Sequence, residues 1–131
     1  MATAAEPMAI TEQTTPEFRN DLNRLNSEDR ARVAIALRRS YDLLRNNRGG
    51  FFARARRPQA IQLKGGFSSS LYSLWVGRDI RLIAAVDEDP VFARTLVTLF
   101  RAVHHEELDR AYRSVASDLY RSQIQRNGRS L

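Results

Sequence analysis

Residues 71–90 read LYSLWVGRDIRLIAAVDEDP, and this stretch decides the fold. Two short runs rich in aliphatic, aromatic and β-branched residues, 71–76 and 80–86, flank the sequence Gly-Arg-Asp at 77–79, which is typical of a tight turn. The pattern predicts two antiparallel strands joined by that turn. Alternation along the second strand places Arg81 on the face opposite to its apolar neighbours, so we expect Arg81 to face away from the helices if these cover the apolar face.

Further strands are predicted on both sides of this hairpin. Residues 95–103 form a third apolar run, and residues 61–63 form a shorter one. Residues 10–14 are either a short edge strand or a leader segment, and the sequence does not distinguish these two interpretations. We therefore expect three or four antiparallel strands.

Two helices are predicted before the strands. Thr15 is a good N-cap, Pro16 suits the first helical position and Glu17 complements the helix dipole. Ser27, followed by two acidic residues, is expected to cap a longer amphipathic helix that runs to about residue 45. The sequence Asn-Asn-Arg-Gly-Gly at 46–50 should end that helix.

A last helix is predicted over residues 106–121, which carry an apolar stripe that includes Tyr112. The predicted fold is a single α+β domain over residues 1–131, in which an N-terminal helical hairpin and a C-terminal helix accompany a small, mostly antiparallel sheet of three or four strands. We expect flexible ends at 1–9 and 124–131.

Composition excludes several classes of protein. The chain has 131 residues, of which 43% are hydrophobic and 27% charged, as in globular proteins. It contains no cysteine, which excludes disulfide frameworks, cysteine-ligated zinc, iron–sulfur clusters and thiol nucleophiles. No apolar run approaches the roughly 18 residues of a membrane span, and the first residues lack a basic, then apolar leader. We expect a soluble cytoplasmic protein without membrane contact.

The excess positive charge lies in one segment. Net charge is +6, and residues 45–64 contain six basic and no acidic residues, so the remaining chain is balanced. Clustered cations near phenylalanines favour nucleic-acid binding, although an acidic protein partner would use the same charges and a solvated loop is the simplest alternative. The candidate nucleic-acid-binding residues are Arg45, Arg48, Arg54, Arg56, Arg57 and Lys64.

The order of these features resembles the RelE/ParE toxin superfamily of toxin–antitoxin modules. The resemblance covers about residues 16–121 and depends most on VGRDIRLI at 76–83, with Leu-Lys-Gly at 63–65 before it and the acidic turn 87–89 after it. It implies that RelE-like members cleave mRNA on the ribosome without a metal or other cofactor, whereas ParE-like members share the fold and poison DNA gyrase. In both groups a small antitoxin holds the toxin inactive.

The resemblance also implies roles for two basic residues. Arg81 matches the strand arginine that stabilises charge on the phosphate, and its alternative is an ion pair with Asp79 or Asp87. Lys64 matches a position where family nucleases place a lysine, and its alternative is a solvated surface residue. Ser73 departs from the family, which commonly has an arginine there, and so removes one cation from the expected site.

His104 and His105 are the only histidines and lie where a strand meets a helix. Imidazole titrates near pH 6.5, so either residue is a candidate general acid or base, with an N-cap or surface role as the alternative. Strand alternation would point the two rings to opposite faces, and no third ligand is evident, so we expect no metal site. Tyr112 matches the family's terminal tyrosine, yet it also belongs to the apolar stripe.

Together these residues predict a RelE-type toxin, an endoribonuclease (mRNA interferase) that inhibits translation. It would act on ribosome-bound mRNA through Arg81, Lys64 and one of the two histidines, and a small acidic antitoxin would neutralise it. A ParE-like inhibitor of DNA gyrase and a non-catalytic nucleic-acid-binding protein on the same fold remain as alternatives.

Overall fold

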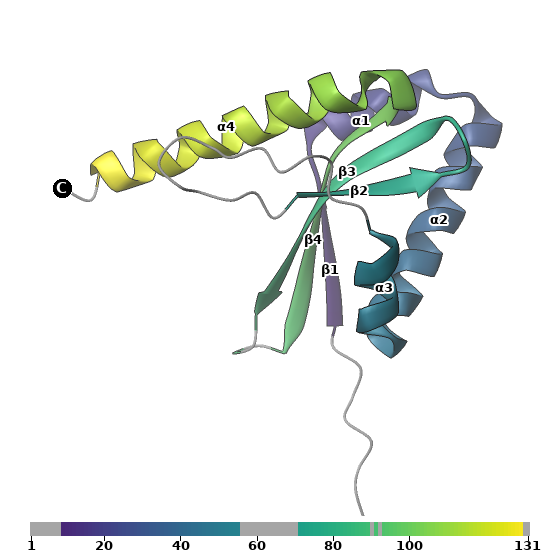
Figure 1. The fold of residues 1–131 in the computed structure, drawn as a ribbon, viewed down its shortest axis with the longest axis horizontal. Coiled ribbons are helices and arrows are strands. Elements are labelled where there is room, and N and C mark those ends of the chain that lie inside the picture. The colour runs from purple at the N-terminus through teal and green to yellow at the C-terminus, as the bar shows by residue number, and fades with distance from the viewer. Residues whose placement is uncertain (1–8, 56–70, 90, 92, 130–131) are drawn as a thin grey trace, which may run out of the picture.

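The structure, a computed structural model, describes residues 9–55, 71–89, 91 and 93–129. It has the predicted α+β architecture of helices around a small sheet (Figure 1). In chain order the elements are β1 (Ala9–Thr14), α1 (Pro16–Arg24), α2 (Ser27–Asn46), α3 (Arg48–Arg54), β2 (Leu71–Val76), β3 (Ile80–Asp89), β4 (Arg94–His104), the short 3-10 helix η1 (His105–Glu107) and α4 (Leu108–Arg129).

The sheet has the strand order β1-β4-β3-β2. Strands β2, β3 and β4 form the predicted antiparallel meander, and β1 pairs with β4 in parallel. Residues 10–14, which the sequence left open, therefore belong to an edge strand. The predicted strand at 61–63 lies outside the described residues.

The N-terminal helices begin at local signals, one of which the prediction misplaced. Thr15 caps α1 as expected, because its hydroxyl accepts a hydrogen bond of 3.0 Å from the Phe18 N–H. The N-cap of α2 is Asn26 instead of Ser27, and its side chain accepts a hydrogen bond of 2.8 Å from the Asp29 N–H. Asparagine and serine are equally good caps, so the propensities alone do not choose between neighbouring candidates.

The stop signal at 46–50 also starts a helix that was not predicted. Helix α2 ends at Asn46, and the side chain of Asn47 then accepts a hydrogen bond of 2.9 Å from the Gly50 N–H and caps α3. Phe51 of α3 is only 2% exposed and packs in the main apolar cluster. Burial of this ring stabilises a short helix whose two glycines disfavour it.

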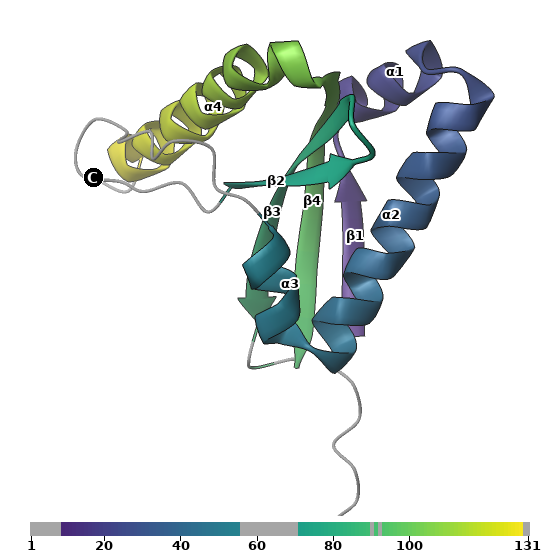
Figure 2. The same cartoon turned by 45° about the vertical axis from the view of Figure 1, so that its right-hand side comes forward.

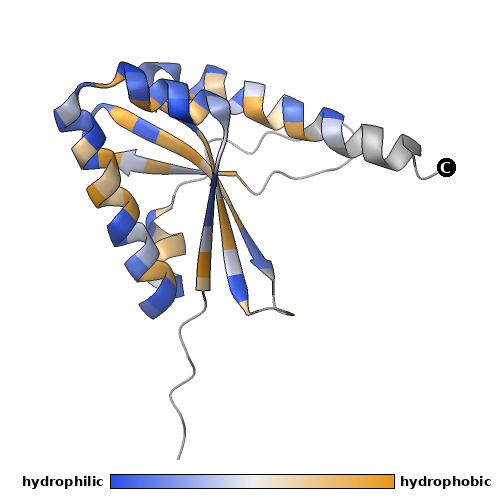
Figure 3. Cartoon of the chain, turned by 180° about the vertical axis from the view of Figure 1, so that it is seen from behind, coloured by the Kyte–Doolittle hydropathy of each residue, from blue (hydrophilic) through white to orange (hydrophobic). Residues whose placement is uncertain are grey.

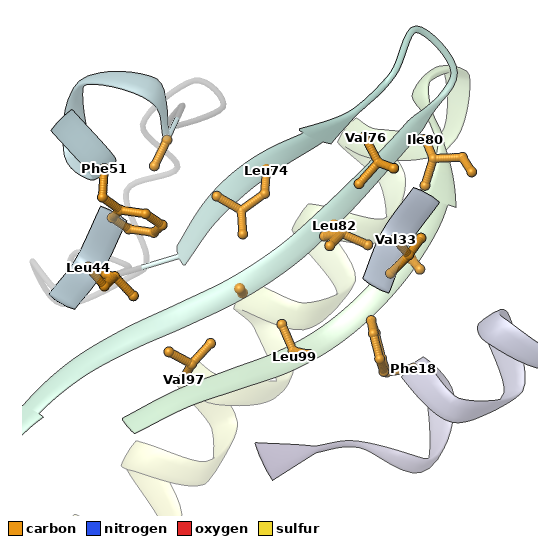
Figure 4. Close-up of a cluster of buried hydrophobic side chains, with 13 residues drawn as sticks. Phe18, Val33, Leu44, Phe51, Leu74, Val76, Ile80, Leu82, Val97 and Leu99 are labelled. Carbon is orange, nitrogen blue, oxygen red and sulfur yellow. The ribbon is translucent and has the colours of Figure 1, made fainter. Parts of the chain in front are cut away.

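The two faces of the sheet are covered by different helices. Side chains of α1, α2 and α3 pack on one face, together with Leu82 and Leu99 of the sheet (Figures 2 and 4). Helix α4 packs on the opposite face against Ile83 and Ala85, and hydrophobic and hydrophilic residues alternate along it (Figure 3). Arg81 belongs to the α4 face, as alternation predicted. Within the described parts of the chain, no helix is long and apolar enough to cross a membrane.

Strand β1 is fastened to α2 by one polar contact. The Tyr41 hydroxyl of α2 donates a hydrogen bond to the Glu12 carboxylate of β1. Burial, together with this bond and the charge of Glu12, raises the pKa of Tyr41 above its ordinary value. The phenol therefore stays protonated at neutral pH and keeps donating its hydrogen bond to Glu12.

Helix α1 completes the pairing of β4 beyond the end of β1. The Thr15 N–H donates to the Leu99 carbonyl at 3.1 Å, and the Thr15 hydroxyl donates to the Phe100 carbonyl at 2.8 Å. Asp21, 6% exposed, then accepts one hydrogen bond from the Ala102 N–H at 3.0 Å and two from the Arg101 guanidinium at 2.7 and 3.1 Å. The hydrogen bonds to Asp21 raise the pKa of Arg101 above its ordinary value.

Replacing Asp21 tests this arrangement. Asp21→Ala should lower the free energy of unfolding by about 3 kcal/mol, because it leaves a partly buried guanidinium and a buried N–H without their acceptor. Asp21→Asn keeps one acceptor oxygen and should cost roughly half as much. Urea denaturation measures both. The control Arg32→Ala, which removes exposed ion pairs to Glu28 and Asp29 within α2, should cost less than about 0.5 kcal/mol. Equal losses in Asp21→Ala and the control would contradict the assignment.

Candidate functional site

Arg81 is built into the turn between β2 and β3. Gly77 adopts φ +62° there, a backbone conformation that favours glycine. The Arg81 guanidinium donates hydrogen bonds to the carbonyl oxygens of Gly77, Arg78 and Ile80 at 3.4, 3.0 and 2.9 Å. It lies 4.0 Å from the centroid of the Trp75 ring, and the residue is 7% exposed. These contacts hold the β2–β3 turn in one conformation, and we call them the Arg81 clamp. The role of Arg81 at a phosphate stays a prediction.

The two histidines come together at the end of β4. His104 is the last residue of the strand, and His105 already belongs to η1. Their ring centroids are 4.6 Å apart and their planes are inclined by 35°. The expectation of opposite faces was wrong because strand alternation ends at His104, so the next side chain no longer follows it.

Asp79 joins the two imidazoles from the β2–β3 turn. The His105 N–H donates a hydrogen bond of 2.7 Å to the Asp79 carbonyl, which brings the turn beside the end of β4. One side-chain oxygen or nitrogen from each of Asp79, His104 and His105 lies within 4.8 Å of the other two, and all three residues are exposed. We call these three residues the His–Asp cluster. The sequence did not predict a third group near the histidines, because Asp79 lies beside them only as a result of how the strands are aligned.

The His–Asp cluster borders the Arg81 clamp. In the β-ladder Arg81 lies opposite Trp75 on one side and Val103 on the other, and the next pair along is Ile80 with His104. Trp75 is 48% exposed despite its size. An exposed indole, two imidazoles and a carboxylate therefore lie at one end of the sheet.

Two further residues that were singled out from the sequence, Tyr112 and Ser73, are buried. Tyr112 is 3% exposed and packs in the cluster between α4 and the sheet, which agrees with the packing interpretation. Ser73 is 1% exposed, and its hydroxyl has no hydrogen-bond partner among the described residues. Ser73 is therefore a buried side chain of β2 and offers no exposed polar group.

Two arginines of the basic segment, Arg45 and Arg48, form ion pairs in the structure. Arg45 pairs with Asp42 at 3.5 Å on the surface of α2. Arg48 pairs with Glu88 and donates a hydrogen bond of 3.3 Å to the Thr95 hydroxyl. Arg54 is exposed on α3. Arg56, Arg57 and Lys64 lie outside the described residues, and the predicted roles of all six residues stay predictions.

A groove separates α2 and α3 from β2, with a volume of about 590 Å³. Ile35 on its wall is 50% exposed and lies off the buried stripe of α2. Arg39 and Arg54, both exposed, also line it, and neither forms an ion pair within the described residues. The groove therefore combines apolar surface with positive charge. The sequence analysis did not predict this groove, although an isoleucine outside the apolar stripe of α2 is a signal that could have indicated it.

Comparison with known proteins returns structures only. No family model and no curated protein matches the chain. A chain of the RelB–RelE antitoxin–toxin complex from Methanococcus jannaschii is 16% identical with a TM-score of 0.43, and the match covers 73% of this chain and 93% of that one. A YoeB/ParE toxin from Agrobacterium tumefaciens is 15% identical with a TM-score of 0.42, covering 72% and 97%. The conserved hypothetical protein HP0894 from Helicobacter pylori is 18% identical with a TM-score of 0.36, covering 74% and 96%.

The contacts of Arg81 predict a structural effect of its replacement. Arg81→Ala should lower the free energy of unfolding by about 2 kcal/mol, because three carbonyl oxygens lose a charged donor and Trp75 loses the cation beneath it. Chemical denaturation measures the change. The matched control Arg78→Ala removes an exposed side chain from the same turn but keeps the carbonyl, and should cost less than about 0.5 kcal/mol. An Arg81→Ala protein as stable as the control would contradict the clamp.

Proposed function

We propose that this protein is a RelE-type toxin, a metal-free endoribonuclease that cuts mRNA on the ribosome and so inhibits translation. The observation that supports the proposal is the His–Asp cluster, because it gathers both imidazoles of the chain and a carboxylate at one exposed place. Two imidazoles in different protonation states can supply the base and the acid that RNA cleavage requires.

The reaction uses the ribose 2′-hydroxyl as its nucleophile. A neutral imidazole removes the proton from this hydroxyl, and the oxygen forms a bond to phosphorus. The bond from phosphorus to the 5′-oxygen breaks as the protonated second imidazole gives its proton to that oxygen. The products are a 2′,3′-cyclic phosphate and a 5′-hydroxyl end. Asp79 is assigned a positioning role, because its carboxylate lies within 4.8 Å of both imidazoles and would set the orientation of a ring whose N–H it accepts.

RNA contacts are available around the cluster. The exposed ring of Trp75 offers a surface on which an unpaired base stacks. Arg78 is exposed in the same turn as Asp79 and offers a cation for a phosphate. With Arg81 held by carbonyl oxygens, we assign the phosphate contact to Arg78, and to Lys64 as the resemblance implies.

Replacement of the cluster residues tests the proposal. His104→Ala and His105→Ala should each reduce mRNA cleavage by about 10²- to 10⁴-fold, the usual contribution of a general acid or base. Asp79→Asn should cost less, roughly tenfold, because the imidazoles remain. Mapping the cut ends of mRNA in a purified translation system measures the rates. Asp87→Asn, which neutralises an exposed carboxylate of β3 outside the cluster, is the matched control and should cleave normally.

A ParE-like gyrase inhibitor is the second candidate. Burial of Ser73 and the clamped position of Arg81 favour it, because a protein that only binds its target needs no cations at those positions. Inhibition of DNA supercoiling by the purified protein, with messages intact, would replace the nuclease proposal by this one. Harmless expression in cells would leave the non-catalytic nucleic-acid-binding protein.

The proposed partner is a small acidic antitoxin. An amphipathic segment with apolar and acidic residues complements the groove, where Ile35 lies beside Arg39 and Arg54. Such a segment would bury the exposed isoleucine and neutralise two arginines.

The groove is tested by a double charge change. Ile35→Glu combined with Arg39→Glu should keep toxicity but weaken binding of the antitoxin at least about tenfold, because it places acidic groups against an acidic segment. The proposal predicts a small acidic antitoxin encoded beside this gene, which is the partner to use, and growth rescue and a binding titration measure the effect. Ala34→Glu with Arg38→Glu adds the same charges to exposed positions of α2 outside the groove and should leave neutralisation intact. Equal rescue of both proteins would contradict the assignment.

A further inference from the structure

We propose that the His–Asp cluster binds one divalent transition-metal ion, with Asp79, His104 and His105 as its three protein ligands. Two imidazoles and a carboxylate are a donor set that zinc and other first-row transition metals bind in proteins. The cluster holds both histidines of the chain, and the chain has no cysteine, so no other nitrogen- and sulfur-based site is available to such an ion.

The backbone fixes the three ligands relative to one another. The His105 N–H bond to the Asp79 carbonyl joins the turn to the end of β4, and His104 is paired with Ile80 in the ladder. The ligand atoms now lie within 4.8 Å of one another, whereas zinc bonds of about 2 Å hold ligands roughly 3.3 Å apart. Because all three side chains are exposed, we expect rotations about their side-chain bonds to close this difference. Water would fill the remaining coordination positions.

The surrounding charge favours a cation. Glu106 and Glu107 directly follow the histidines and are exposed, so with Asp79 three carboxylates lie within a short stretch of surface. Of the nearby cations, Arg101 is neutralised by Asp21 and Arg81 is held by carbonyl oxygens of its own turn. Arg78, beside Asp79, is exposed and is the one of these three that opposes a bound cation. A divalent ion at the imidazoles therefore reduces repulsion among these acids as well as gaining ligands.

Metal binding would also inhibit RNA cleavage, and this consequence rests on the proposed function. A coordinated ring nitrogen neither accepts nor donates a proton, so the occupied cluster loses its acid and base. The ion would then act as a reversible inhibitor of the toxin.

Calorimetric titration of the protein without an affinity tag tests the site. Zinc chloride should bind with one ion per chain, and magnesium, which prefers oxygen ligands, should give no comparable signal. His104→Ala, His105→Ala and Asp79→Asn should each weaken zinc binding at least about tenfold, since even the loss of an outer-shell partner costs that much. Zinc should also raise the melting temperature of the wild-type protein, because it joins the turn to β4. Asp87→Asn should bind zinc as the wild type does.

Two results would overturn the site. One is unchanged zinc affinity in a folded His104→Ala/His105→Ala protein, and the other is unchanged affinity in Asp79→Asn, with folding checked by circular dichroism. Because calorimetry involves no RNA, the two proposals fail separately. Zinc binding without any RNA cleavage removes the nuclease and keeps the metal site, whereas cleavage that depends on the histidines without zinc binding does the reverse.

Discussion

The rest of the structure depends on the pairing of β4 along both of its edges. Strand β3 pairs with it over nearly its whole length, and β1 pairs with it only as far as Leu99. From there Thr15 and Asp21 supply the hydrogen-bond partners that a strand would otherwise provide. A buried Ala102 N–H without an acceptor would lower the free energy of unfolding by an amount that is a large part of the stability of a small domain. Near the end of β4, where the histidines lie, hydrogen bonds with Thr15 and Asp21 therefore replace pairing with a neighbouring strand and hold β4 in place.

Local sequence signals predicted the strands and the first helix well. The runs 71–76 and 80–86 and the capped start at Thr15 became β2, most of β3 and α1, because alternation and capping are short-range effects. Helix α3 was missed since its stability comes from burial of Phe51 under the sheet, which no local propensity encodes. Residues 46–50 were correctly interpreted as an end of α2, but the same asparagine that terminates one helix caps the next.

The candidate site was harder to predict because it depends on register. Sequence patterns identified both histidines, yet Asp79 reaches them only through the alignment of β3 with β4 and the bond from His105 to its carbonyl. Arg81 was placed on the correct face, but its direction follows from three carbonyl oxygens in a turn whose conformation depends on Gly77. The alternation pattern identifies the face on which a residue lies, whereas the contacts of its side chain decide whether its charge reaches solvent.

In the two proposals the same three side chains serve proton transfer and metal binding, and electrostatics would separate these two uses. Three neighbouring carboxylates attract a cation to the imidazoles and repel a phosphate, so RNA must be held by cations outside the cluster, such as Arg78. Metal and RNA would also compete for the same ring nitrogens. Such competition is reciprocal by thermodynamic linkage, so an RNA that occupies the cluster weakens metal binding by the same factor as the metal weakens RNA binding. If both proposals hold, the carboxylates around the histidine pair would therefore link the activity of the site to the concentration of free metal.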